Sequence, residues 1–133
     1  MTFNIPLRVR NLIRRHGTAS PRSIAEDLGF TVWEWEEAPA KINGLWRRIL
    51  RRKYIVVDAS LAPWQKDAVI AHELGHFFLH RGYKNFSLEG RTYFASARKE
   101  QEANEFAALL MEEFSPMSQT AVVDFLDHSW QKK

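Results

Sequence analysis

The chain has 133 residues, a formal net charge of +3 and no cysteine. Its length suits one domain with its own core, and its 45% hydrophobic and 26% charged residues exclude a disordered or collagen-like chain. The absence of cysteine excludes disulfides, thiolate zinc fingers and iron–sulfur clusters, so a metal site would depend on His, Asp and Glu. No apolar run is long enough to span a bilayer, and the N-terminus lacks a signal-peptide pattern. We therefore expect a single cytoplasmic domain over residues 1–133.

Two short helices are predicted at the start of the chain. Apolar residues recur at helical spacing over Ile5–His16, and Gly17 can end that helix. Ser20 followed by Pro21 is a typical cap-and-proline start for a second helix, which Gly29 can end.

Strands and a long helix follow. Phe30–Trp35 has the pattern of a strand, and Leu45–Asp58 holds two further β-rich runs with a hairpin around Arg51–Lys53. From Pro63 to His80 the spacing is helical and contains no breaker, which predicts a central helix.

The last third is expected to be a loop followed by two helices. Residues 83–96 fit a loop with a short strand at Arg91–Phe94, and Arg98–Glu113 has a strong helical pattern. Ser115–Pro116 predicts the start of a final helix that runs to about Trp130. The order of elements predicts an α+β fold, in which a short antiparallel or mixed sheet packs on the central helix and on further C-terminal helices.

Positive charge is concentrated in the first half of the chain. Up to residue 60, eleven Lys/Arg face six Asp/Glu, whereas from residue 61 onward eight face ten. Much of the excess lies in one run, namely Arg47, Arg48, Arg51, Arg52 and Lys53. Such a run can form a phosphate-binding patch, but more often it forms a solvated strand face and turn.

The central helix contains His72-Glu73-Leu74-Gly75-His76, an H-E-x-x-H motif. Its two histidines share one helical face and lie about 6 Å apart along the axis, so both can reach one metal ion. Glu73 points to the side, where it can reach a water molecule on that ion without being a ligand. The alternative, two core histidines satisfied by backbone carbonyls, explains neither the glutamate nor the spacing.

A catalytic zinc site usually has a third protein ligand. His80 lies about 12 Å along the axis from His72, too far to share the ion. On the Arg98–Glu113 helix, the apolar stripe of Ala103, Phe106, Ala107, Leu109 and Leu110 places Glu102 on the buried face. Glu100, Glu105 and Glu112 fall on its flanks or beyond. We therefore predict His72, His76 and Glu102 as metal ligands, with Glu105 as the alternative to Glu102.

Two segments of the chain resemble the ImmA/IrrE family of bacterial and phage metallopeptidases. They are the H-E-x-x-H motif followed by Leu79-His80, and the later segment Glu102-Ala103-Asn104-Glu105-Phe106-Ala107-Ala108-Leu109-Leu110-Met111. The helix at Ser23–Gly29 and the strand at Tyr54–Asp58 are similar in kind, whereas Glu112 stands where the family has a proline. The resemblance implies a small zincin-like domain of the gluzincin type that binds one Zn²⁺ per chain and hydrolyses peptide bonds.

In such a site, zinc lowers the pKa of a water molecule toward about 7, and Glu73 would take its proton and pass it to the leaving amine. Candidate donors to the developing oxyanion are His80, Tyr93 and Arg91, and His80 is also a candidate for capping the helix or supporting a metal ligand. We expect an extended substrate to pair with the strand at Tyr54–Asp58.

The resemblance further implies that the substrate is a helix-turn-helix transcriptional repressor, whose cleavage derepresses stress or defence genes. Single-stranded DNA is a candidate activator, because the basic run is flanked by Trp46 and Tyr54 and could bind a phosphate backbone with base stacking. Two alternatives are a DNA-binding regulator with a structural or inactive metal site, and a toxin–antitoxin protein. Against the regulator, the segment from Phe30 onward fits a strand and not a third, recognition-type helix.

Overall fold

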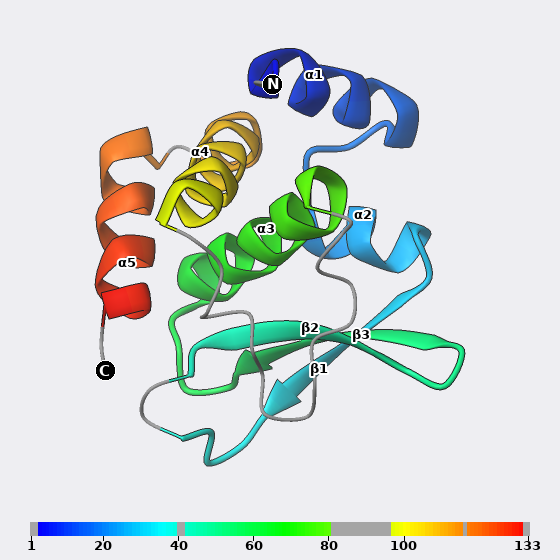
Figure 1. Cartoon of the computed structure of the whole chain (residues 1–133), viewed down its shortest axis with the longest axis vertical. Coiled ribbons are helices and arrows are strands. Elements are labelled where there is room, and N and C mark those ends of the chain that lie inside the picture. Colours follow the sequence, from blue (N-terminus) through cyan, green and yellow to red (C-terminus); the bar gives the residue numbers. More distant parts are fainter. Residues whose placement is uncertain (1–2, 40–41, 81–96, 116, 132–133) are drawn as a thin grey trace.

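A computed structural model describes residues 3–39, 42–80, 97–115 and 117–131. Its elements are, in chain order, α1 (Ile5–His16), α2 (Pro21–Asp27), β1 (Phe30–Trp35), β2 (Gly44–Ile49), β3 (Arg52–Asp58), α3 (Pro63–Leu79), α4 (Ala97–Phe114) and α5 (Gln119–Gln131). Helix α3 lies between the sheet on one side and α4 and α5 on the other, with α1 across the end of the helical layer (Figure 1). The predicted α+β, zincin-like architecture is confirmed.

The first two helices begin and end where the sequence predicts. The Asn4 side chain accepts a hydrogen bond from the Leu7 N–H at 3.2 Å, and Gly17 ends α1 in the left-handed region at φ 71°. The Ser20 hydroxyl accepts a hydrogen bond from the Ser23 N–H at 3.2 Å, which caps α2. Each cap satisfies a backbone group that the helix leaves without an internal partner.

Strand β3 occupies the centre of the three-stranded sheet. Strand β1 pairs with it in parallel and β2 pairs with it antiparallel, giving the order β1-β3-β2. Because both edges of β3 are already paired, Tyr54–Asp58 cannot accept a further strand, and the expectation that substrate pairs there is wrong. The hairpin turn also differs slightly from the prediction, since Ile49 pairs with Arg52 and the turn lies at Leu50 and Arg51.

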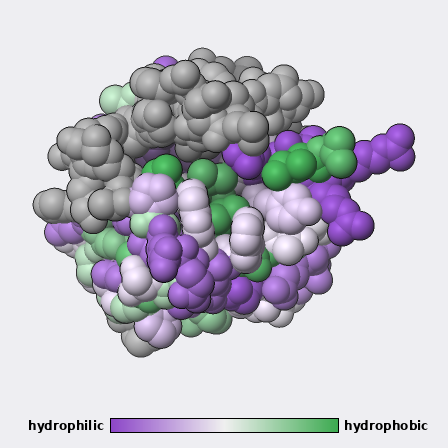
Figure 2. All heavy atoms as spheres, turned by 90° about the horizontal axis from the view of Figure 1, so that it is seen from below, coloured by the Kyte–Doolittle hydropathy of each residue, from purple (hydrophilic) through white to green (hydrophobic). Residues whose placement is uncertain are grey.

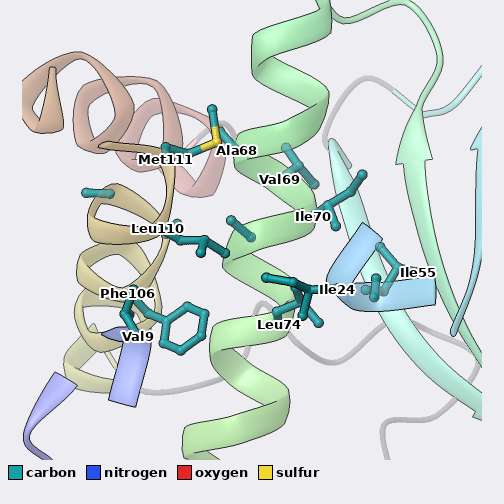
Figure 3. Packing of buried hydrophobic residues seen from close by; sticks show 14 of the residues in the cluster. Val9, Ile24, Ile55, Ala68, Val69, Ile70, Leu74, Phe106, Leu110 and Met111 are labelled. Atoms are coloured by element: carbon teal, nitrogen blue, oxygen red, sulfur yellow. The ribbon is translucent and has the colours of Figure 1, made fainter. Parts of the chain in front are cut away.

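The core is built around α3. Figure 3 shows Val69 and Ile70 on the side of the helix that faces the sheet, and Leu110 of α4 on the opposite side. The buried residues of α3 cover most of its circumference, which fixes this helix in position. They are Ala68, Val69, Ile70, Ala71, Glu73, Leu74, Gly75, His76 and Leu79.

The final helix starts later than predicted. The Ser115 N–H donates to Met111 O at 2.8 Å, so this serine lies at the end of α4 and not at the start of α5. Ser118 takes the capping role, because its hydroxyl accepts a hydrogen bond from the Ala121 N–H at 3.1 Å. The strand predicted at Arg91–Phe94 lies outside the described residues. Within the described ranges, none of the helices has the length and apolar character needed to cross a membrane.

Candidate metal site

Three side chains from α3 and α4 converge at one point. Glu100 Oε1 lies 3.1 Å from His72 Nε2 and 3.3 Å from His76 Nε2. The three potential ligand atoms all lie within 4.8 Å of one another, which makes this group a candidate metal site. Two imidazole nitrogens and one carboxylate oxygen are the donor set of many catalytic zinc sites. The residues present therefore fit a divalent transition metal such as zinc.

A close helix crossing brings Glu100 to the two histidines. A Cβ atom added at Gly75 would lie 3.2 Å from the Cα and the carbonyl oxygen of Ala103, so the backbones of α3 and α4 nearly touch there. Glu100 precedes Ala103 by about one helical turn on the same face of α4. The glycine inside the H-E-x-x-H motif thus sets the distance between the two ligand-bearing helices.

The structure places Glu100, and not Glu102, beside the histidines, which corrects the predicted ligand set. The buried face of α4 includes Asn104 and Ala108, which shift its centre away from Leu109 and toward Glu100. Glu102 lies at the edge of this face and accepts a hydrogen bond from His80 Nε2 at 2.8 Å. The predicted stripe left out the buried apolar residues Ala108 and Met111 as well as the buried polar Asn104, so it was centred too close to Leu109. Glu105, the alternative ligand, is exposed.

The charges in the cluster are strongly coupled. Burial acts to raise the pKa of Glu100, but hydrogen bonds from His72 and His76 outweigh it and lower that pKa to about 2. Burial lowers the pKa of His76 to about 4, with the Glu100 hydrogen bond acting in the opposite direction. For His72 the hydrogen bond and the charge of Glu100 outweigh burial, so its pKa is raised. Metal binding requires an ionised carboxylate and neutral histidines, so the states of Glu100 and His76 match this requirement, whereas the proton favoured on His72 must leave when a metal binds.

Glu73 lies beside this cluster and is 4% exposed. Burial raises the pKa of Glu73 to about 7, although the neighbouring His72 and a hydrogen bond from the backbone of Trp46 lower it. Among the described residues nothing hydrogen-bonds to its Oε1 atom. A buried carboxylate with an unpaired oxygen is suited to accept a proton.

His80 supports the site from the end of α3. Its backbone N–H donates to His76 O at 2.8 Å, so it forms the C-cap of the helix, as one of the predictions had it. Its Nδ1 atom lies 2.9 Å from His76 Nδ1, on the side of that ring away from Glu100. Because Glu102 engages its other ring nitrogen, His80 has no free donor for an oxyanion. The other two candidate donors, Tyr93 and Arg91, lie outside the described residues.

Asn104 is a site residue that the sequence prediction missed. It is 3% exposed, and its Nδ2 atom donates to Asp127 of α5 at 2.8 Å. Asn104 also lies close enough to His72 to contribute to raising its pKa, although neither Asn104 Oδ1 nor His72 Nδ1 has a hydrogen-bond partner among the described residues. The signal in the sequence was the spacing, because Glu100 and Asn104 are four residues apart and therefore share one face of a helix.

The basic run lies in the β2–β3 hairpin, and its members differ in their exposure to solvent. Arg48, Arg51 and Arg52 are exposed. Lys53 instead donates to the Leu28 carbonyl at 2.7 Å and lies 4.8 Å from the centre of the Phe30 ring, so its charge faces the interior of the fold. Figure 2 shows a hydrophobic group flanked by strongly hydrophilic side chains at its right-hand end, the end where Figure 1 places the hairpin.

Comparison with known proteins gives one matching family and one similar curated protein. The Peptidase_M78 family, described as the IrrE N-terminal-like domain, matches residues 25–123. A curated relative, the "Uncharacterized immunity region protein 2" of Bacillus phage phi105, is 33% identical over 107 residues, which cover 80% of this chain and 67% of the relative. No solved structure matches the chain significantly.

Proposed function

We propose that the chain, which belongs to the IrrE N-terminal-like (Peptidase_M78) family, is a zinc-dependent endopeptidase. Family membership and the geometry of the site both support this proposal. The observation that carries the proposal is the convergence of His72, His76 and Glu100 within 4.8 Å, beside a buried glutamate. We assign the three residues as ligands of one Zn²⁺ per chain, although a His/His/Glu set also accepts other divalent ions. Bound zinc would supply Lewis-acid activation of water and of the scissile carbonyl.

Glu73 is the proposed catalytic base. Its buried carboxylate has a pKa raised to about 7, which is suited both to accepting a proton from water and to passing that proton to the leaving amine. The hydrogen bond from the Trp46 backbone orients the carboxylate from the β2 side.

The outer edge of β2 is the proposed place for the substrate backbone. Within the described residues β2 pairs only with β3, and Trp46 of β2 contacts the catalytic carboxylate through its backbone. An extended peptide added to this edge would therefore pass next to Glu73. This proposal replaces pairing with β3, whose edges are both occupied.

The proposed substrate is a helix-turn-helix repressor in the cytoplasm, whose cleavage derepresses stress or defence genes. Family membership and the phage immunity-region relative support this proposal. The alternative of a DNA-binding regulator has less support, because β1 follows α2 directly and leaves no recognition helix in that position.

The test is cleavage of a purified candidate repressor by the zinc-loaded protein, followed by mass spectrometry of the fragments. Glu73→Gln should reduce the rate by at least about a hundredfold, because it removes the base, and should leave zinc binding intact. Glu105→Gln, which changes an exposed carboxylate of α4, is the matched control and should cleave normally. Equal cleavage by Glu73→Gln would contradict the assigned mechanism.

We further propose that single-stranded DNA binds the β2–β3 hairpin and activates cleavage. The exposed arginines of the turn can contact phosphates, and their replacement by Arg51→Glu with Arg52→Glu should abolish any stimulation of cleavage by single-stranded DNA. Arg14→Glu with Arg15→Glu makes the same charge change on the exposed face of α1 and serves as the control. An absence of stimulation, or equal losses in both double variants, would reject a DNA site at the hairpin.

A further inference from the structure

A chain of hydrogen bonds runs from one proposed metal ligand to a carboxylate on the other helix. His76 Nδ1 lies 2.9 Å from His80 Nδ1, and His80 Nε2 lies 2.8 Å from Glu102 Oε1. The second oxygen of Glu102 lies 3.5 Å from Arg98 Nε, which holds this carboxylate from the preceding turn of α4. His76, His80 and Glu102 therefore form a continuous hydrogen-bonded path behind the proposed metal site.

The environment excludes solvent from the middle of this path. The His80 side chain is only 2% exposed and that of Glu102 is 16% exposed. Phe3 packs edge-on against the His80 ring, with the ring centres 6.1 Å apart. A buried imidazole needs partners for both nitrogens, and His80 has one at each.

Metal binding would fix the direction of both hydrogen bonds. The Nε2 atom of His76 faces Glu100, so this nitrogen would bind the metal and the ring proton must reside on Nδ1. That proton can only be donated to His80 Nδ1, which must then be an unprotonated acceptor. Neutral His80 consequently carries its proton on Nε2 and donates it to Glu102.

We infer that His80 and Glu102 are positioning residues that act on the metal through His76. Histidine ligands commonly donate their second nitrogen directly to a carboxylate, which orients the ring and makes it a stronger ligand. In this protein a second histidine extends that connection, so the carboxylate acts through two imidazole rings. The inference rests on the proposed metal site, and it gives the second glutamate of Glu100-Gln101-Glu102 a role distinct from that of the first.

The most direct test is the protonation pattern of the histidine rings in the zinc-loaded protein. Long-range ¹H–¹⁵N correlation spectra should show a protonated Nδ1 on His76, an unprotonated Nδ1 on His80 and a protonated Nε2 on His80. The opposite tautomer of His80 would overturn the inference, because His76 would then have no acceptor.

Zinc affinity, measured by competition with a chelator, provides the second test. His80→Phe and Glu102→Leu should each weaken zinc binding by about 10–100-fold, whereas Glu102→Gln should recover much of the loss, because its amide oxygen still accepts from His80. The control is Glu105→Leu on the exposed side of α4, which should change the affinity less than twofold. An affinity of Glu102→Leu within twofold of the native protein would contradict the inference.

Non-additivity separates a relay from general damage to the fold. If Glu102 acts only through His80, combining His80→Phe with Glu102→Leu should weaken zinc binding no more than His80→Phe alone. Fully additive losses would mean that Glu102 acts independently and would overturn the inference. If the native protein does not bind zinc at all, the proposed function is rejected. This result differs from the additive losses that would overturn the inference, so the two failures are distinguishable.

Discussion

Asn104 is a buried polar residue that joins α4 to α5 close to the site. Its amide donates to Asp127 at 2.8 Å, and the residue lies close enough to His72 to contribute to raising the pKa of that histidine. The side chain is buried, so an apolar replacement would leave Asp127 without this donor.

We predict that Asn104→Leu lowers the free energy of unfolding by about 1–3 kcal/mol, the usual cost of leaving a buried polar group unsatisfied. It should also weaken zinc binding, because it replaces a polar neighbour of the His72 ring by an apolar one. Urea denaturation and chelator competition measure the two effects, with Gln101→Leu on the exposed side of α4 as the control. A variant as stable as the control would show that the hydrogen bond from Asn104 to Asp127 contributes little.

At the scale of elements, the crossing of α3 and α4 at Gly75 decides the geometry of the site. Alanine at position 75 would be favoured by about 1 kcal/mol in an isolated helix. In this fold its Cβ would meet the Ala103 backbone at 3.2 Å, where no flexible side chain can move away. We therefore predict that Gly75→Ala destabilises the protein by about 1–3 kcal/mol and weakens metal binding, because α4 must shift. Thermal unfolding with and without zinc measures both effects. A Gly75→Ala variant that is more stable than the native protein would contradict the close contact between α3 and α4 at this position.

The ion pairs of Glu34 tie β1 to two helices. Glu34 accepts hydrogen bonds from Lys66 of α3 at 2.8 Å and from Arg22 of α2 at 3.1 Å, and the Lys66 hydrogen bond is the largest cause of its lowered pKa. A carboxylate with a lowered pKa in the folded state stabilises the protein above its unfolded pKa, and this contribution is lost as the pH falls through the folded pKa.

For Glu34→Gln we predict a loss below about 1 kcal/mol at pH 7, because the pair is partly exposed and screened by solvent. The difference from the native protein should shrink as the pH falls below about 4.5, since protonation of Glu34 removes the same charge. Urea denaturation at pH 7 and pH 3 measures it, with Glu36→Gln, an exposed carboxylate beyond β1, as the reference. A difference that grows toward low pH would contradict the assigned sign.

Local signals predicted the elements well, and tertiary packing explains the discrepancies. The caps of α1 and α2 and the long apolar pattern of α3 depend on neighbouring residues, so they are visible in the sequence. The central place of β3 depends on which strands pair, which no local pattern determines. The two H-E-x-x-H histidines were predictable for the same reason as the helices, because both belong to one element.

The third member of the cluster depends on how two helices meet. Both Glu100 and Glu102 contact a histidine of α3, but the former lies beside His72 and His76 and the latter beside His80. The predicted stripe included the half-buried Leu109 but left out the buried Ala108, Met111 and Asn104, so it was centred too close to Glu102.

At the scale of the whole molecule, the proposed site joins the two layers around α3. Helix α4 contributes Glu100, α5 supports the site through Asp127, and β2 contacts Glu73 through its backbone. A metal ion held at this junction would bind only the folded chain, so its binding energy adds to the stability of the whole fold.

Zinc at 100 times its dissociation constant should therefore stabilise the protein by about 2.7 kcal/mol, and removal of zinc by a chelator should reverse the effect. If residues 1–133 form one domain, as predicted, urea unfolding should be a single transition both with and without zinc. Thermal and urea unfolding measure both, and Glu100→Gln should abolish the zinc-dependent part. Zinc-dependent stabilisation that persists in Glu100→Gln would place the metal elsewhere.

The central claim is that His72, His76 and Glu100 form a three-ligand metal site, and elemental analysis of tag-free protein tests it most directly. After equilibration with excess zinc and removal of weakly bound ions, the native protein should contain about one equivalent, and His76→Ala and Glu100→Ala should contain little. With free zinc held in excess, Glu102→Ala should still bind near one equivalent. A folded native protein without bound zinc, or zinc retained in Glu100→Ala but lost in Glu102→Ala, would contradict the account.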